Sequence, residues 1–158
     1  MFKKLLLVVA FFVTVTSAIG QEIAEKDLIG SWSLRAFKMK RVYFDIEKDS
    51  IRLPDDLLVG KSDSEIKEFE TLFREKYLKP STLSKIESTR FIFNEDSTVE
   101  ANMGGNIRNT KYTIVKKNED YFMNDLESEE QVLIRLDNDL LHIHINDDML
   151  LVLQRKED

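Results

Sequence analysis

The sequence predicts a mainly β protein: an eight-stranded antiparallel up-and-down barrel with one helix inserted between the first and second strands. Short apolar runs separated by Asn, Asp and Gly clusters fill the second half of the chain. One long connection near the middle has helical spacing instead. Closing such strands into a barrel removes the free edges that invite aggregation. With 158 residues, of which 42% are hydrophobic, the chain suits a single domain with one core.

The C-terminal meander has the strongest pattern. Its three apolar runs, 132–136, 140–145 and 149–153, are separated by short Asn/Asp clusters that suit tight turns. A two-residue turn at 138–139 gives an unbroken apolar face, whereas a three-residue turn would place histidines on it. A two-residue turn at 146–147 or at 147–148 adds Leu150 and Val152 to the same face. The expected cross-strand pairs are Leu136 with Leu141, Ile134 with Ile143, and Val132 with Ile145.

The earlier strands follow the same logic. The first begins at 28–32 and points Trp32, Leu34 and Ala36 to one side. Alternation resumes at 42–46, so this strand is long, bent or followed by a second short piece. Residues 47–60 are expected to be a loop. The remaining strands are expected at 91–93, 98–103, 111–115 and 121–123, and an acidic loop over 124–130 leads to the meander.

The inserted helix begins at Ser62, where Ser62 and Glu65 form a capping-box pattern. Pro80 is expected to end it. Its apolar residues must lie against the sheet, over either the barrel mouth or its side. They recur at helical spacing: Ile66, Phe69, Leu72, Phe73 and Tyr77.

The N-terminus has the layout of a secretory signal peptide over 1–20, separate from a barrel domain over 28–156. Two lysines precede an apolar run at 5–15, which is too short to span a bilayer, and small residues follow. Cleavage is expected after Gly20, with Ala18 as second choice and a retained signal anchor as the alternative. No cysteine is present, which excludes a lipid-attachment cysteine and disulfides. We therefore expect an exported protein, soluble in the periplasm or outside the cell.

Charge argues against nucleic acid as a partner. The net charge is −6, and removal of 1–20 takes away two lysines and no acids, leaving 21 basic and 29 acidic groups, a net of −8. A surface this acidic repels phosphate backbones. No protein partner is indicated by any motif.

The motif Gly30-Ser31-Trp32, together with Arg155 after the last strand, resembles the lipocalin (calycin) signature. The hairpin at 91–98 is similar to one in the small secreted lipocalin-like domains of bacteria. The resemblance implies that Trp32 closes one end of the barrel and that Arg155 packs across its ring. Typical lipocalins also have a helix after the last strand, and this chain has none. Its helix lies instead between the first two strands, where fatty-acid-binding relatives place a lid.

An eight-stranded barrel is filled by its own side chains or holds one small ligand. We expect a binder of a small apolar or amphipathic molecule. The alternative is an envelope protein-interaction module with a filled barrel, suggested by the mixed face of Met149, Leu151 and Leu153 and by the long segment 40–60. The residues expected to point inward and bind the ligand, together with Ala36, are Trp32, Leu34, Phe91, Phe93, Tyr112 and Ile114.

Enzymatic activity is not expected. His142 and His144 share one strand face and are spaced to chelate a metal, with Asp147 and Asp148 nearby, but no third ligand has a recognised spacing. The chain has no cysteine, no Gly-X-Ser-X-Gly and no phosphate-binding glycine loop. We predict no catalytic residues, no metal and no cofactor.

Overall fold

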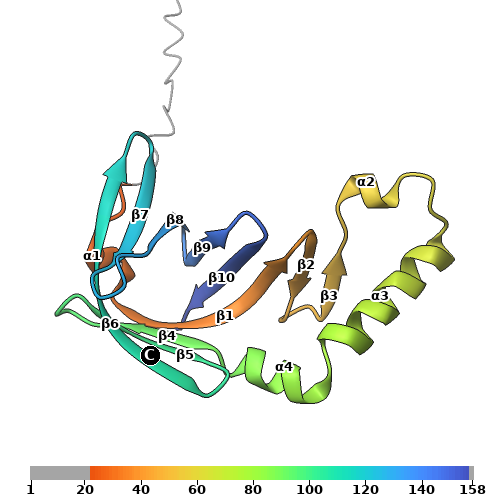
Figure 1. Ribbon diagram of the computed structural model, residues 1–158, viewed down its shortest axis with the longest axis horizontal. Helices are drawn as coiled ribbons and strands as arrows, with labels where there is room; N and C mark the ends of the chain where they lie inside the picture. The colour runs from red at the N-terminus through yellow and green to blue at the C-terminus, as the bar shows by residue number, and fades with distance from the viewer. Residues whose placement is uncertain (1–21, 157–158) are drawn as a thin grey trace, which may run out of the picture.

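The computed structural model describes residues 22–156. The predicted signal peptide, 1–20, lies outside them. Eight strands pair antiparallel in sequence order, and the last pairs with the first to close a barrel, which confirms the predicted fold class (Figure 1). The barrel strands are β1 (Gly30–Met39), β4 (Arg90–Phe93), β5 (Thr98–Met103), β6 (Asn106–Lys117), β7 (Asp120–Asp125), β8 (Gln131–Asp137), β9 (Leu140–Asn146) and β10 (Met149–Arg155).

Strand β1 belongs both to the barrel and to an extension beside it. One edge pairs with β10 along nearly its whole length. The other edge pairs first with β4 and then with β2 (Val42–Asp45), which pairs in turn with β3 (Ser50–Arg52). The second short piece expected after the first strand is therefore β2. The expectation of a loop over 47–60 is wrong, because β3 and the short helix α2 (Asp55–Leu58) lie there.

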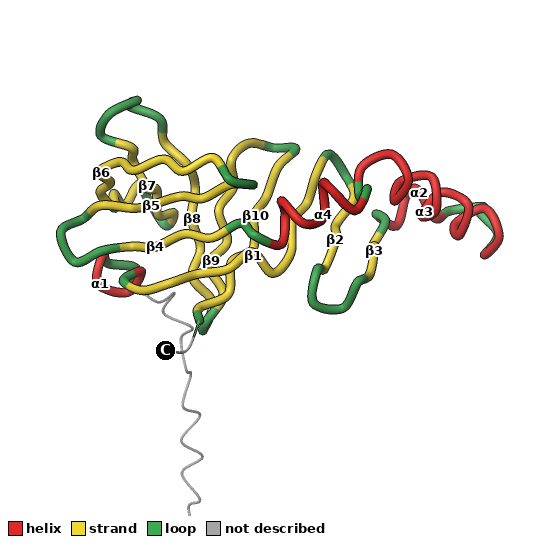
Figure 2. Tube along the Cα trace, turned by 90° about the horizontal axis from the view of Figure 1, so that it is seen from below, coloured by secondary structure: helices red, strands yellow, loops and turns green. Residues whose placement is uncertain are grey.

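The predicted helix is α3 (Asp63–Tyr77), and its capping box is present. Pro80 does not simply end it: this proline opens a further helix, α4 (Pro80–Glu87), at a first-turn position where its missing N–H costs nothing. In both views the β2–β3 hairpin lies between α3 and the barrel, so α3 does not cover the mouth (Figures 1 and 2). A fourth helix, α1 (Glu25–Leu28), lies in the segment before β1.

Helix α3 uses only part of its apolar stripe for packing. Phe73 is buried and lies with its ring centroid 5.0 Å from that of Tyr77. Arg74 lies over the ring of Phe44 in β2, at 5.7 Å from the centroid, and forms a 2.7 Å ion pair with Asp49. Phe69 and Leu72 remain exposed.

The predicted register of the meander is correct for its first hairpin and wrong for its second. Ile134 faces Ile143, and Leu136 faces Leu141. Between β9 and β10, however, Asn146 pairs with Met149 while His144 pairs with Leu150, so Ile145 is an extra residue. This bulge shifts the alternation of inward and outward side chains on β10 by one residue. The residues of β10 that face the interior are therefore Leu151 and Leu153, and Leu150 and Val152 face outward.

A similar irregularity in β1 moves Ala36 away from the interior. Leu34 pairs with Leu153, but Ala36 pairs with Val152 and Phe37 with Leu151. Arg35 is the additional residue, and beyond it Phe37 takes the inward position. The prediction that Ala36 points inward is wrong for this reason, although Ala36 is itself fully buried.

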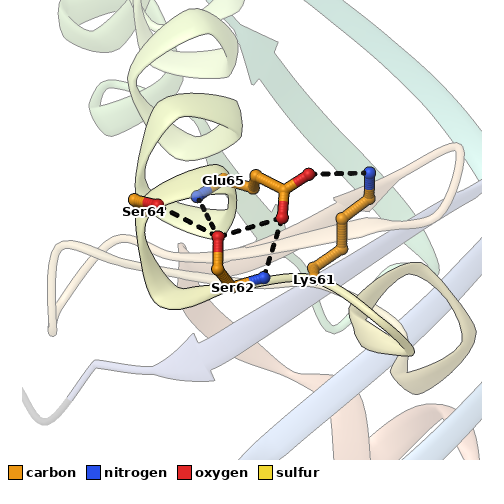
Figure 3. A network of polar contacts seen from close by, with 4 residues as sticks. All are labelled: Lys61, Ser62, Ser64 and Glu65. Carbon is orange, nitrogen blue, oxygen red and sulfur yellow. Dashed lines mark hydrogen bonds and ion pairs between the residues drawn. The ribbon is translucent and has the colours of Figure 1, made fainter.

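Figure 3 shows how the start of α3 is capped. The Ser62 hydroxyl accepts a 3.4 Å hydrogen bond from the Glu65 amide, and the Glu65 carboxylate accepts a 2.9 Å bond from the Ser62 amide. Lys61 adds a 3.4 Å ion pair to the other carboxylate oxygen. Two amides that have no partner inside the helix are thereby satisfied.

We expect Ser62→Ala to destabilise α3 by about 1 kcal/mol, because a lost serine cap costs this much. Hydrogen exchange of amides within 63–77 should then be about fivefold faster, while amides of β8 and β9 exchange as before. Ser64→Ala is the matched control, since the Ser64 hydroxyl contacts only that of Ser62. Equal effects of the two substitutions would contradict the capping role.

Candidate functional site: a pocket at the open end of the barrel

One end of the barrel is closed by Trp32 and Arg155. Trp32 is fully buried, and its indole N–H donates a 2.7 Å hydrogen bond to the carbonyl of Leu28. The guanidinium of Arg155 lies 4.4 Å from the ring centroid. It also donates to the carbonyl of Ile29 at 2.6 Å and to that of Asp27. Arg155 thus ties the last strand to the segment that precedes the first.

Gly30 is required where Arg155 passes the backbone. Its φ of +125° is a conformation that L side chains rarely adopt, and an added Cβ would lie 3.3 Å from a guanidinium nitrogen. Gly30 and Trp32 of the Gly-X-Trp motif are therefore each explained by local contacts. The short α1 lies at the same end, and Leu28 at its terminus is fully buried (Figure 1). Sequence patterning missed this helix, because 21–27 reads as a polar lead-in.

The half of the barrel next to this floor is filled by side chains. Phe93 and Tyr112 meet edge to face with their ring centroids 5.3 Å apart. Large residues from the facing strands occupy the remaining space and are almost completely buried: Ile134, Leu141, Ile143 and Leu153.

The other half contains a pocket of about 150 Å³. Its opening lies at the end of the barrel formed by the β5–β6 hairpin and the segment between β7 and β8. The walls are mainly apolar, and polar side chains are confined to β6, the end of β7 and the loop after it. The lining residues are Phe91, Val99, Ala101, Met103, Arg108, Thr110, Tyr112, Met123, Asp125, Glu130, Val132, Ile143, Ile145 and Leu151.

Two of the six ligand-binding residues predicted from the sequence, Phe91 and Tyr112, line this pocket. Trp32, Leu34 and Phe93 are buried in the core cluster, and Ile114 is partly buried against it. The lining residues that the sequence analysis missed lie on all the strands from β5 to β10 and in the loop before β8. They were missed because the depth of a residue inside the barrel depends on how neighbouring strands are staggered. Inward alternation on β5 and β7 would have found Ala101 and Met123.

Asp125 organises the polar rim of the pocket. It is the last residue of β7, and β6 continues past it, so that Arg108 and Thr110 of β6 reach its carboxylate. Arg108 forms a 2.8 Å ion pair with it, and the Thr110 hydroxyl donates a 2.6 Å hydrogen bond. Burial alone would raise the pKa of Asp125. The hydrogen bonds from Thr110 and from the amides of Glu127 and Ser128 outweigh burial and hold this pKa well below its usual range.

Tyr112 brings a polar group into the apolar interior. Its hydroxyl is buried and has no hydrogen-bond partner among residues 22–156. Burial, with smaller contributions from the negative charges of Glu25 and Asp96, raises its pKa to about 12. Tyr112 therefore remains a neutral hydrogen-bonding group at physiological pH.

His142 and His144 lie on the outer face of the barrel, paired with Arg135 and Leu133 of β8. Burial lowers the pKa of His142, and burial together with the charge of Arg135 lowers that of His144. Within 22–156, no group of three His, Cys, Asp or Glu side chains is placed to hold a metal ion.

Comparison with protein-family models, with curated proteins and with solved structures finds no match to this chain. Among the described residues, no helix combines the length and the apolar character needed to cross a membrane.

We expect Arg155→Met to lower the free energy of unfolding by about 2 to 4 kcal/mol, because the substitution leaves two carbonyls unpaired and removes the cation over Trp32. Urea denaturation followed by Trp32 fluorescence measures this change. Arg135→Met is the control: its ion pair with Asp120 spans 3.6 Å between exposed side chains, and its loss should cost at most about 1 kcal/mol. Similar losses in both variants would rule out the closing role of Arg155.

Proposed function

We propose that the protein is an exported, lipocalin-like binding protein that takes a small apolar or amphipathic molecule into the barrel pocket. The apolar pocket with a polar rim carries this proposal, because small-molecule sites combine apolar walls with a few polar groups that orient the ligand. Export is supported by the signal-peptide pattern over 1–20. The family resemblance is supported by Gly30, Trp32 and Arg155, which meet at one end of the barrel.

The size of the pocket limits the ligand. Pockets for drug-sized molecules are about 300 to 1,000 Å³, and this one is about half the lower value. An engineered apolar cavity of about 150 Å³ in another protein binds benzene. We therefore propose a ligand whose apolar part is one ring or a short chain. A long acyl chain would have to displace the side chains that fill the closed half.

We propose no enzymatic activity for this pocket. Its charged groups are Arg108, Asp125 and Glu130, and Arg108 and Asp125 are paired with each other. The strongly lowered pKa of Asp125 makes it a poor general base, because a useful catalytic pKa lies near the working pH.

Ala101→Leu tests the pocket by filling it. Ala101 lines the wall between Phe91 and Arg108, and a leucine there would occupy space that the ligand needs. We expect toluene to raise the melting temperature of the native protein, since a ligand stabilises the folded state that binds it. The Ala101→Leu protein should show at least a tenfold weaker apparent affinity.

Glu100→Leu is the matched control for this experiment, because it places the same side chain one residue away on the outer face of β5. Its affinity for toluene should equal that of the native protein. An unchanged affinity in Ala101→Leu would exclude this pocket as the binding site, and a native protein that binds no single-ring compound would refute the proposed function.

A protein-interaction role is the second candidate. Leu151 and Leu153 no longer support it, because they face the interior. The exposed apolar residues of α3 and of the segment before it favour it instead: Val59, Phe69 and Leu72, with exposed fractions of 80%, 41% and 57%. If this surface binds a second copy or another protein, Leu72→Ser should abolish the rise in light-scattering mass with concentration or the capture of an envelope partner. A native protein that is monomeric at all concentrations and captures nothing would count against this role.

A further inference from the structure

We infer that the pocket selects ligands with a positively charged head, such as an ammonium group attached to a single ring. This inference rests on the proposed function, and it concerns the polar rim rather than the apolar walls. The rim contains one cation and two anions: Arg108, Asp125 and Glu130.

Two of these charges already satisfy each other. Arg108 forms its 2.8 Å ion pair with Asp125, which accepts further hydrogen bonds from Thr110 and from two backbone amides. An anionic ligand would have to share Arg108 with Asp125, whose negative charge already offsets the positive charge of the guanidinium. Among the described residues, the pocket rim therefore offers no uncompensated cation to a carboxylate or phosphate ligand.

Glu130 is the third charged residue of the pocket rim. No cation within the described part of the chain forms an ion pair with it, and its side chain is exposed beside the pocket. Its carbonyl accepts a 2.9 Å hydrogen bond from the amide of Asp125, which fixes its backbone at the rim. A ligand whose ring lies between the apolar walls can hold a charged group at this rim without burying it.

The surrounding loop strengthens the preference. Glu127 and Glu129 lie exposed in the same segment between β7 and β8 and add two negative charges close to Glu130 in the chain. Such exposed charges attract a cation modestly, and salt weakens the attraction. The expected effect is a selectivity between ligands of equal size, added to the affinity that the apolar walls provide.

Toluene, benzylamine and benzoate form a series with one ring and a neutral, a cationic or an anionic substituent at neutral pH. We expect benzylamine to bind about tenfold more tightly than benzoate at about 0.1 M salt, with toluene between them. The ratio should narrow at about 1 M salt. Ligand-observed NMR titration measures all three affinities on the same protein.

Glu130→Gln should reduce the preference for benzylamine over benzoate, measured as the ratio of the two affinities, about fivefold. Glu127→Gln is the matched control, because it removes the same charge from the same loop but does not line the pocket. It should retain most of the preference.

The outcomes separate this inference from the proposed function. If none of the three compounds binds, the proposed function itself fails. If toluene binds while benzoate binds as tightly as benzylamine or more tightly, the pocket stands and the cationic preference is overturned. If Glu127→Gln and Glu130→Gln reduce the preference equally, the assignment to Glu130 is overturned.

Discussion

The pairing of β10 with β1 holds this fold together, because it turns an open series of hairpins into a closed barrel. The two strands meet along almost the full length of β1, and Arg155 reinforces the pairing at one end through Trp32 and two carbonyls. Residues 126 and 128 positions apart in sequence are joined by these two bonds. Such closure carries a large entropic cost, and tight packing of the floor offsets it.

Strands β1 and β9, which both pair with β10, each contain an additional residue, and these irregularities determine which side chains face the barrel interior. The extra residue in β1 brings Phe37 to the inner face, and the one in β9 brings Leu151 and Leu153 there. Regular strands would have placed Ala36, Leu150 and Val152 inside. Of the residues that do face inward, Leu153 is buried in the filled half and Leu151 lines the pocket, where the small Ala101 stands opposite Phe91.

Local patterns were enough to predict the fold class, the helix α3 and the first hairpin of the meander. Each of these follows from alternation, capping or turn residues that lie close together in the sequence. Bulges are different, because they depend on how a strand must bend to meet distant partners. The prediction for Ala36 failed for this reason. The β2–β3 hairpin was only half recognised, because β3 has three residues and its alternation is too short to detect.

The candidate site could be predicted only in part. Aromatic residues such as Phe91 and Tyr112 stand out in alternating strands, and both line the pocket. The sequence does not reveal which inward residues lie beside the cavity and which lie within the filled half, as Phe93 does. The rim was missed because Arg108 and Asp125 are neighbours only through the overhang of β6 beyond β7. The extent of this overhang depends on the lengths of β6 and β7.

The sheet ends at β3, and the free edge of this strand affects self-association at high protein concentration. An open sheet margin is a template on which further chains can add. Here the margin consists of the three residues Ser50–Arg52, and Pro54, which has no amide hydrogen, follows closely. A second molecule would find too few free donors and acceptors for stable growth. The shortness of β3 thus protects the molecule against ribbon-like self-association.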